Sequence, residues 1–329
     1  MKALITGGAG FIGVHLARAM LERGWQVDLV DNFARGVLDA ELDSLQGSGS
    51  VRLIERDLLA PDAFVGVGDD YEYVVHFAAI VGVSNVVGRP YDVLTDNVLM
   101  TSHVISWARR QPRLERFLFA STSEVYAGTL THLGVPIPTP EDVLLTLADL
   151  GEPRTSYLLS KLYGEAMCHH AGIPFTIFRP HNVYGPRMGL SHVIPELLER
   201  AHAAADGESV EVFSVDHRRT FCYVEDAVEM MLRAAQSPAA AGETLNIGNQ
   251  APEVTIGDLA PLVVKAVGKS LEIVPLPPTP GSPPRRCPDM TKTTALTGYE
   301  PVVSLERGIE QTYDWYRTRV FEAEGIVAR

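Results

Sequence analysis

Cysteine is scarce in this chain, and the three that occur, Cys168, Cys222 and Cys287, are odd in number and lack the spacing of a metal site. They provide no disulfide framework, so we expect a reducing compartment. The apolar first residues lack the basic lead and cleavage site of a secretory signal. No apolar run is long enough to cross a bilayer. These absences favour a cytoplasmic protein without a membrane partner.

Basic residues are also in the minority. The chain has 28 Lys and Arg against 41 Asp and Glu, a formal net charge of −13. This acidity argues against nucleic-acid or anionic-membrane partners, and an anionic substrate would need a local cluster of arginines. The histidines are unclustered, and the adjacent His169 and His170 would point to different faces of a helix. We therefore predict no metal site.

The length and composition are those of a soluble globular protein. With 329 residues, 46% hydrophobic and 21% charged, the chain can bury a large core and is long for one domain. Apolar runs of strand length alternate with segments of helical period, which predicts an α/β fold with a doubly wound parallel Rossmann sheet. The expected strands are 51–55, 73–77, 116–120 and 175–178, and the main helices 91–110 and 157–171.

The pattern loosens after about residue 180. Prolines and glycines become frequent and are densest at 275–289, which excludes a regular helix or a central strand there. A helix around 225–235 and a strand at 244–247 look as though they return to the first lobe. We therefore expect a nucleotide-binding lobe over 1–181 with return segments at about 216–249. A smaller, discontinuous substrate-binding lobe would be built from 182–215 and 250–329.

The first thirty-one residues carry the clearest chemical signal: a buried strand, a glycine turn, an amphipathic helix and a second strand. Gly7, Gly10 and Gly13 have the spacing of a dinucleotide-binding turn, which brings the helix N-terminus to a pyrophosphate. Asp31 ends the second strand, where its carboxylate can accept both ribose hydroxyls. A 2′-phosphate would be repelled there, so we predict NAD rather than NADP.

A tyrosine and a lysine form a second constellation. Tyr157 and Lys161 stand at i and i+4 in a helical segment, on one face and a turn apart. An ammonium this close, together with an oxidised nicotinamide nearby, should favour the phenolate and lower the pKa of Tyr157, so that the phenol can act as a base. Thr122 directly follows a predicted strand and can hydrogen-bond the same substrate oxygen. Serine and threonine are also common turn residues at such positions.

With these features the whole chain resembles the extended short-chain dehydrogenase/reductase family that acts on nucleotide sugars. That family includes 4-epimerases, 4,6-dehydratases and UDP-glucuronate decarboxylases. The motifs that carry the resemblance are TGGAGFIG (6–13), VDN (30–32), RDL (56–58), HFAA (76–79), STSEVY (121–126), YLLSK (157–161), RPHNVYGPR (179–187), RRTFCYVEDAV (218–228) and RRCPD (285–289).

The resemblance implies a role for each matching position. The cofactor residues would be Gly7, Gly10, Phe11, Ile12, Gly13, Asp31, Asn32, Asp57, Leu58, Phe77, Ala78, Ala79, Asn97, Tyr157 and Lys161. The catalytic residues would be Thr122, Ser123, Glu124, Tyr157 and Lys161, and the substrate would contact Thr122, Glu124, Asn182, Arg219 and Arg286. The resemblance further implies a UDP-sugar substrate and a homodimer formed through helices 91–110 and 157–171.

The reaction that follows oxidation at sugar C4 stays open. We place 4-epimerisation first for its generality, with decarboxylation of a UDP-uronate nearly level and dehydration third. Glu124 beside Ser123 resembles the decarboxylases and some 4,6-dehydratases, and Arg286 in RRCPD resembles the decarboxylases. Residues 193–195 look more like the epimerase and dehydratase branches. His181 stands where many relatives have an aromatic residue. A non-catalytic NAD-binding regulator is the alternative from another class, and the intact set of Thr122, Tyr157 and Lys161 argues against it.

Overall fold

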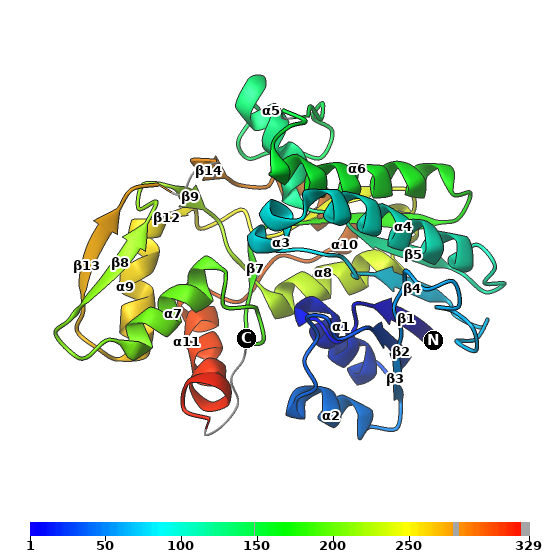
Figure 1. Cartoon of the computed structure of the whole chain (residues 1–329), viewed down its shortest axis with the longest axis horizontal. Coiled ribbons are helices and arrows are strands. Elements are labelled where there is room, and N and C mark those ends of the chain that lie inside the picture. Colours follow the sequence, from blue (N-terminus) through cyan, green and yellow to red (C-terminus); the bar gives the residue numbers. More distant parts are fainter. Residues whose placement is uncertain (148, 279–282, 324–329) are drawn as a thin grey trace.

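A parallel sheet forms the centre of the molecule. The computed structural model describes residues 1–147, 149–278 and 283–323, and in this part of the chain seven strands form one sheet in the order β11-β6-β5-β4-β1-β2-β3 (Figure 1). All neighbouring strands run parallel. The doubly wound sheet predicted from the sequence is thus confirmed. The strands are β1 (Lys2–Thr6), β2 (Gln26–Asp31), β3 (Val51–Glu55), β4 (Tyr73–His76), β5 (Arg116–Ala120), β6 (Phe175–Pro180) and β11 (Thr244–Ile247).

Helices cover both faces of this sheet because its strands are apolar on both sides. In β1, Ala3 and Ile5 belong to one buried cluster, while Leu4 between them belongs to the other. The first cluster includes residues of α1 (Phe11–Glu22), α2 (Ala40–Gln46) and α8 (Val224–Gln236), with α10 (Thr291–Thr297) beside them. The second includes residues of α4 (Pro90–Ala108) and α6 (Pro153–His170), with α3 (Val83–Gly88) against α6.

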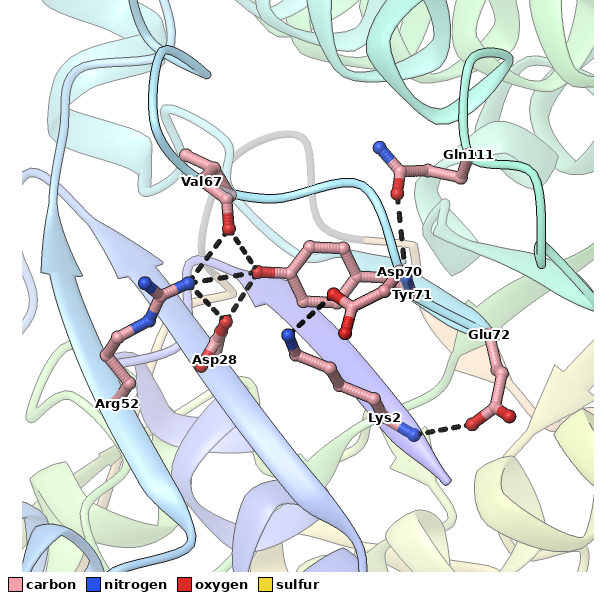
Figure 2. Close-up of polar contacts among 8 residues, drawn as sticks. All are labelled: Lys2, Asp28, Arg52, Val67, Asp70, Tyr71, Glu72 and Gln111. Atoms are coloured by element: carbon pink, nitrogen blue, oxygen red, sulfur yellow. Dashed lines mark hydrogen bonds and ion pairs between the residues drawn. The ribbon is translucent and has the colours of Figure 1, made fainter.

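Strand order reverses between β1 and β4, which opens a crevice at the carboxyl ends of the strands. At the amino ends, a polar network fixes the connection that leads into β4 (Figure 2). The Tyr71 phenol and the Arg52 guanidinium both contact Asp28 Oδ2, and both donate to Val67 O. Lys2 Nζ pairs with Asp70 at 2.6 Å. This network lies at the end of the sheet opposite the carboxyl ends of the strands, where ligands bind in folds of this kind.

A third buried cluster lies away from the sheet, at the left of Figure 1. It joins α7 (Val193–Ala203), α9 (Ile256–Val267) and α11 (Leu305–Tyr316) to the parallel pair β8 (Ser209–Phe213) and β13 (Glu272–Leu276). We propose that this cluster is the core of the second lobe. Met290 and α10 instead pack with the first cluster on the sheet, although they lie inside the range expected for the second lobe, 250–329.

Short elements complete the described structure. These are η1 (Ser123–Tyr126), α5 (Ala127–His132), η2 (Pro238–Ala240), the pair β7 (Val183–Tyr184) and β10 (Cys222–Tyr223), the ribbon of β12 (Val254–Thr255), β9 (Arg218–Arg219) and β14 (Arg285–Arg286), and the last turn η3 (Arg317–Phe321). Among the described helices, none has both the length and the apolar character of a membrane span.

Candidate functional site

The glycine motif between β1 and α1 leaves no room for a side chain at Gly7 or Gly13. Gly7 has φ +68°, and a Cβ there would lie 2.6 Å from Ala78 N. A Cβ on Gly13 would lie 2.6 Å from Gly7 O. Gly10 is the N-cap of α1 and provides no side-chain cap, so the amides of Phe11 and Ile12 begin the helix uncapped. A tight turn that ends in an uncapped helix N-terminus suits a pyrophosphate.

Asp31 lies directly against this turn. Its Oδ2 accepts a hydrogen bond from Ala9 N at 3.0 Å, and its Oδ1 accepts from Phe33 N at 2.9 Å. These bonds fix the carboxylate at the end of β2, where the sequence predicted a ribose site. Asn32 and Asp57 line one surface hollow with Glu55 and Arg56. This hollow at the ends of β2 and β3 is where the adenosine would lie.

Two predicted cofactor residues are used differently from their neighbours. The Leu58 side chain is buried in the core, so only its backbone can face a cofactor. Asn97 is buried in α4, where its Oδ1 accepts from Ile80 N at 2.7 Å and its Nδ2 donates to Ile80 O at 3.1 Å. Asn97 therefore braces the loop that carries Phe77, Ala78 and Ala79, and its role is positioning.

Thr122 and Tyr157 come together at the carboxyl end of β5. The Thr122 hydroxyl hydrogen-bonds the phenol, and burial, followed by the charge of Glu124, raises the pKa of Tyr157 well above its usual range. The Thr122 bond and the charge of Arg35 oppose this rise. Lys161 is not among the groups that shift this pKa in the protein alone. The expected lowering by Lys161 together with an oxidised nicotinamide stays a prediction.

The geometry of Lys161 agrees with its small effect on the tyrosine. Its Nζ donates to Ala120 O at 2.8 Å and lies 5.8 Å from the centre of the Tyr157 ring. Burial lowers the pKa of Lys161 to about 8, with Glu165 partly opposing the change. The ammonium is thus held against the end of β5.

Glu124 and Arg286 form an ion pair beside this tyrosine. Arg286 Nη1 donates to Glu124 Oε1 at 2.7 Å, and both side chains are partly buried. Burial alone would raise the pKa of Glu124, but Arg286 first, then Arg154 and Arg219, hold it below its usual range. Ser123 is buried in the same short helix η1.

The ribbon of β9 and β14 explains which arginines face the site. The two strands pair in parallel, with Arg286 opposite Arg219 and Arg285 opposite Arg218. Because side chains alternate along a strand, the pairs point to opposite sides. Arg218 and Arg285 share Glu253 on the surface, whereas Arg219 is buried. Burial and the neighbouring Arg286 lower the pKa of Arg219 to about 10, so two guanidiniums meet where an anion would bind.

Asn182 lies just after β6 and is bonded to the segment that follows β9. It has φ +41°, its Nδ2 donates to Thr220 O at 2.9 Å, and its own carbonyl accepts from Cys222 N. Its amide nitrogen therefore holds the strand that carries Arg219, and any contact with a substrate would use the remaining oxygen.

Sequence reasoning missed Arg187. Its buried side chain donates to Ala9 O at 2.9 Å and to Val37 O at 2.8 Å, and its Nε pairs with Asp39 at 2.7 Å. Arg187 thus connects the segment that follows β7 to the glycine turn. It lies in the RPHNVYGPR motif quoted above, and that position was the available signal. Arg154 and Arg35 were also missed. Arg154 stands three residues before Tyr157 in α6, a helical spacing that was the available signal, whereas no spacing connects Arg35 to Tyr157.

Comparison with known proteins agrees with this geometry. The model of the NAD dependent epimerase/dehydratase family matches residues 3–248. The chain belongs to this family. It is 33% identical to UDP-N-acetyl-alpha-D-glucosaminuronate decarboxylase of Bacillus cytotoxicus, over 96% of this chain and 98% of that protein. It is 32% identical to UDP-glucuronic acid decarboxylase 1 of Xenopus tropicalis, over 96% of this chain and 72% of that protein.

Among solved structures, the chain is similar to UDP-glucuronic acid 4-epimerase from Bacillus cereus in complex with UDP-glucuronic acid and NAD. The TM-score is 0.84 at 29% identity, covering 97% of this chain and 99% of that one. The resemblance to extended short-chain dehydrogenases/reductases and the prediction of an NAD-dependent enzyme are confirmed. The regulator alternative is therefore not retained. The glycine turn fits NAD because only glycine keeps the turn tight: a side chain at Gly7 or Gly13 would clash with the backbone of the turn or of the segment after β4. Asp31 fits NAD because its carboxylate is fixed at the end of β2, beside this turn.

Proposed function

We propose that this chain decarboxylates a UDP-hexuronate through transient oxidation at sugar C4. The observation that carries the proposal is the ion pair of Glu124 and Arg286 beside Thr122 and Tyr157. Epimerisation at C4 needs no acid or base beyond the tyrosine. An additional carboxylate and guanidinium suit a reaction that also changes the bonding at C5 and C6.

The substrate class follows from the charges around Glu124. Three arginines, Arg154, Arg219 and Arg286, act on this one carboxylate, so the local charge is positive in a chain of net charge −13. A UDP-uronate brings a diphosphate and a carboxylate to that charge. Planar guanidiniums bind both groups well. The two decarboxylases described above, whose names specify UDP-uronates, support this class.

The shared first step uses the tyrosine. Bound NAD would supply the hydride acceptor for C4 and a cationic ring that favours the phenolate. Tyr157 accepts the proton of the 4-hydroxyl, and Thr122 holds the phenol by a hydrogen bond. Lys161 Nζ is fixed by its hydrogen bond to Ala120 O, one helical turn from the tyrosine.

The second step distinguishes this reaction from its relatives. A ketone at C4 makes the C6 carboxylate part of a β-keto acid, which loses CO2 and leaves an enolate across C4 and C5. Arg219 and Arg286 stabilise negative charge on the sugar, and C5 must then regain a proton. Because the pKa of Glu124 is held below its usual range, its carboxylate is ionised and cannot itself give that proton. We propose that a water molecule held by Glu124, Arg286 and Ser123 supplies the proton to C5. Reduction of the ketone completes the turnover.

Epimerisation at C4 remains the second candidate. The similarity to the UDP-glucuronic acid 4-epimerase favours it, because that enzyme is named for the same class of sugar. Sequence analysis placed epimerisation first, and the ion pair of Glu124 and Arg286 is our reason for reversing that order.

A substrate panel tests the proposal. UDP-glucuronate, UDP-galacturonate and UDP-N-acetylglucosaminuronate are incubated with NAD-supplemented enzyme, and products are read by mass spectrometry. We expect a product lighter by one CO2 from at least one of them. Conversion without a change in mass would favour epimerisation, and loss of water would favour dehydration.

A further inference from the structure

His181 is a buried side chain at the site to which the mechanism above gives no role. It is the first residue after β6 and is 3% exposed. Its ring centre lies 5.8 Å from that of Tyr126 in η1, which follows the neighbouring strand β5. His181 Nε2 lies 2.9 Å from Asn246 Oδ1. The other ring nitrogen, Nδ1, has no hydrogen-bond partner among the described residues.

The position of the imidazole proton follows from the partners of Asn246. Asn246 Nδ2 donates to Thr139 O at 3.0 Å and to Asp289 O at 3.1 Å. The atom that faces His181 must therefore be the amide oxygen, which has no proton to give. Tyr126 also bonds this oxygen, at 2.9 Å. His181 consequently donates through Nε2–H.

The ring carries no second proton. Burial first, then the charges of Arg286 and Arg179, lower the pKa of His181 to about 3, against the opposing bond to Asn246. At neutral pH, Nδ1 is thus a bare lone pair. A buried acceptor without a donor costs free energy, and such atoms in native proteins have a structural or functional explanation.

An unpaired donor lies on Arg286, whose charge acts on the His181 ring. Arg286 Nε is buried and lacks a partner among the described residues, while Nη1 of the same guanidinium holds Glu124. A carboxylate or phosphate oxygen has no proton and cannot satisfy His181 Nδ1. A hydroxyl group can both donate to an acceptor and accept from a donor. The chemistry of the two atoms therefore selects a hydroxyl.

We propose that His181 Nδ1 accepts a hydrogen bond from a ring hydroxyl of the sugar, and that Arg286 Nε donates to the oxygen of that hydroxyl. His181 is then a specificity-determining residue of the sugar site. The inference rests on the proposed function only in taking a nucleotide sugar as the substrate.

Two substitutions separate the functions of the two ring nitrogens. His181→Gln keeps a donor at the place of Nε2 for Asn246 and removes the acceptor. His181→Asn keeps an acceptor oxygen at the place of Nδ1 and gives up the bond to Asn246. Affinities of NAD-loaded enzyme for UDP-glucuronate and for UDP alone are measured by titration calorimetry. We expect His181→Gln to weaken the binding of UDP-glucuronate about tenfold and to leave the affinity for UDP unchanged. His181→Asn should keep both affinities within about threefold of wild type but melt at a lower temperature.

Deoxy sugars test the same bond in the wild-type protein. Removing one ring hydroxyl of UDP-glucuronate should weaken binding about tenfold in wild type and cause no further loss in His181→Gln. The inference would be overturned if His181→Gln lost affinity equally for UDP and UDP-glucuronate, or lost affinity for NAD instead. It would also be overturned if removing any single ring hydroxyl left the affinity of the wild-type protein unchanged. Wild-type enzyme that distinguishes the hydroxyl but releases no CO2 would refute the proposed reaction and support this inference.

Discussion

Replacing Arg286 by alanine removes the guanidinium that pairs with Glu124 and leaves the oxidation groups untouched. The bond at 2.7 Å is charge-assisted and only 14% of the Arg286 side chain is exposed, so its loss should cost about 1.5–3 kcal/mol in the interaction alone. The lost acid–base and electrostatic contribution adds to this, and we expect kcat to fall about 10²–10⁴-fold.

The substitution should also change the pH dependence. Glu124 has a pKa held below its ordinary value by Arg286, so the carboxylate stays ionised as pH falls to that lowered value. Without Arg286 the pKa rises, because burial then acts against fewer positive charges. If activity needs the carboxylate, the acidic limb of the kcat profile moves to higher pH in Arg286→Ala.

The neighbouring arginine provides a matched control. Arg285 lies on the same strand but points outward, where its exposed guanidinium pairs with Glu253. An exposed pair contributes about 0–1 kcal/mol, so Arg285→Ala should retain nearly full activity and an unshifted profile. Steady-state rates with a UDP-uronate over a range of pH decide the matter. Equal losses in both variants, or a fully active Arg286→Ala protein, would refute this reasoning.

Three further predictions concern the cofactor, the oxidation step and assembly. Asp31→Ala should weaken the binding of NAD and reduce the preference of the protein for NAD over NADP, measured by fluorescence titration. A wild-type protein that binds both cofactors equally would contradict the role of Asp31. Tyr157→Phe should reduce turnover at least about 10²-fold while NAD stays bound, and unchanged turnover would remove the tyrosine from the mechanism. We propose a homodimer through α4 and α6, whose exposed apolar residues include Leu99 and Tyr163, 49% and 55% exposed. Leu99→Glu with Tyr163→Glu should give monomers by light scattering, and a monomeric wild-type protein at micromolar concentration would disprove the dimer.

The sheet could be predicted from the sequence because its strands depend on local patterns. The expected strands 51–55, 116–120 and 244–247 coincide with β3, β5 and β11. Helix α6 begins earlier than the expected residue 157, since Pro153 at its first turn favours a helix start and the polar residues that follow hide the period.

The site could be predicted as a set of residues but not as a set of contacts. Spacing showed that Tyr157 and Lys161 share a helix face, but not that Nζ of the lysine reaches Ala120 O. The inward direction of Arg286 depends on its register with Arg219, which lies far away in the chain. The proton position on His181 likewise depends on partners distant in sequence, which no local pattern reveals.

The central claim is that this protein removes the carboxyl group of a UDP-uronate. The most direct measurement uses a UDP-uronate carrying an isotopic carbon label at C6, incubated with the enzyme and NAD and followed by nuclear magnetic resonance. The account predicts that the label moves from the sugar to dissolved CO2 and bicarbonate, at a rate that falls severely in Glu124→Gln. A label that stays on a sugar inverted at C4, at the same rate in wild type and Glu124→Gln, would contradict it.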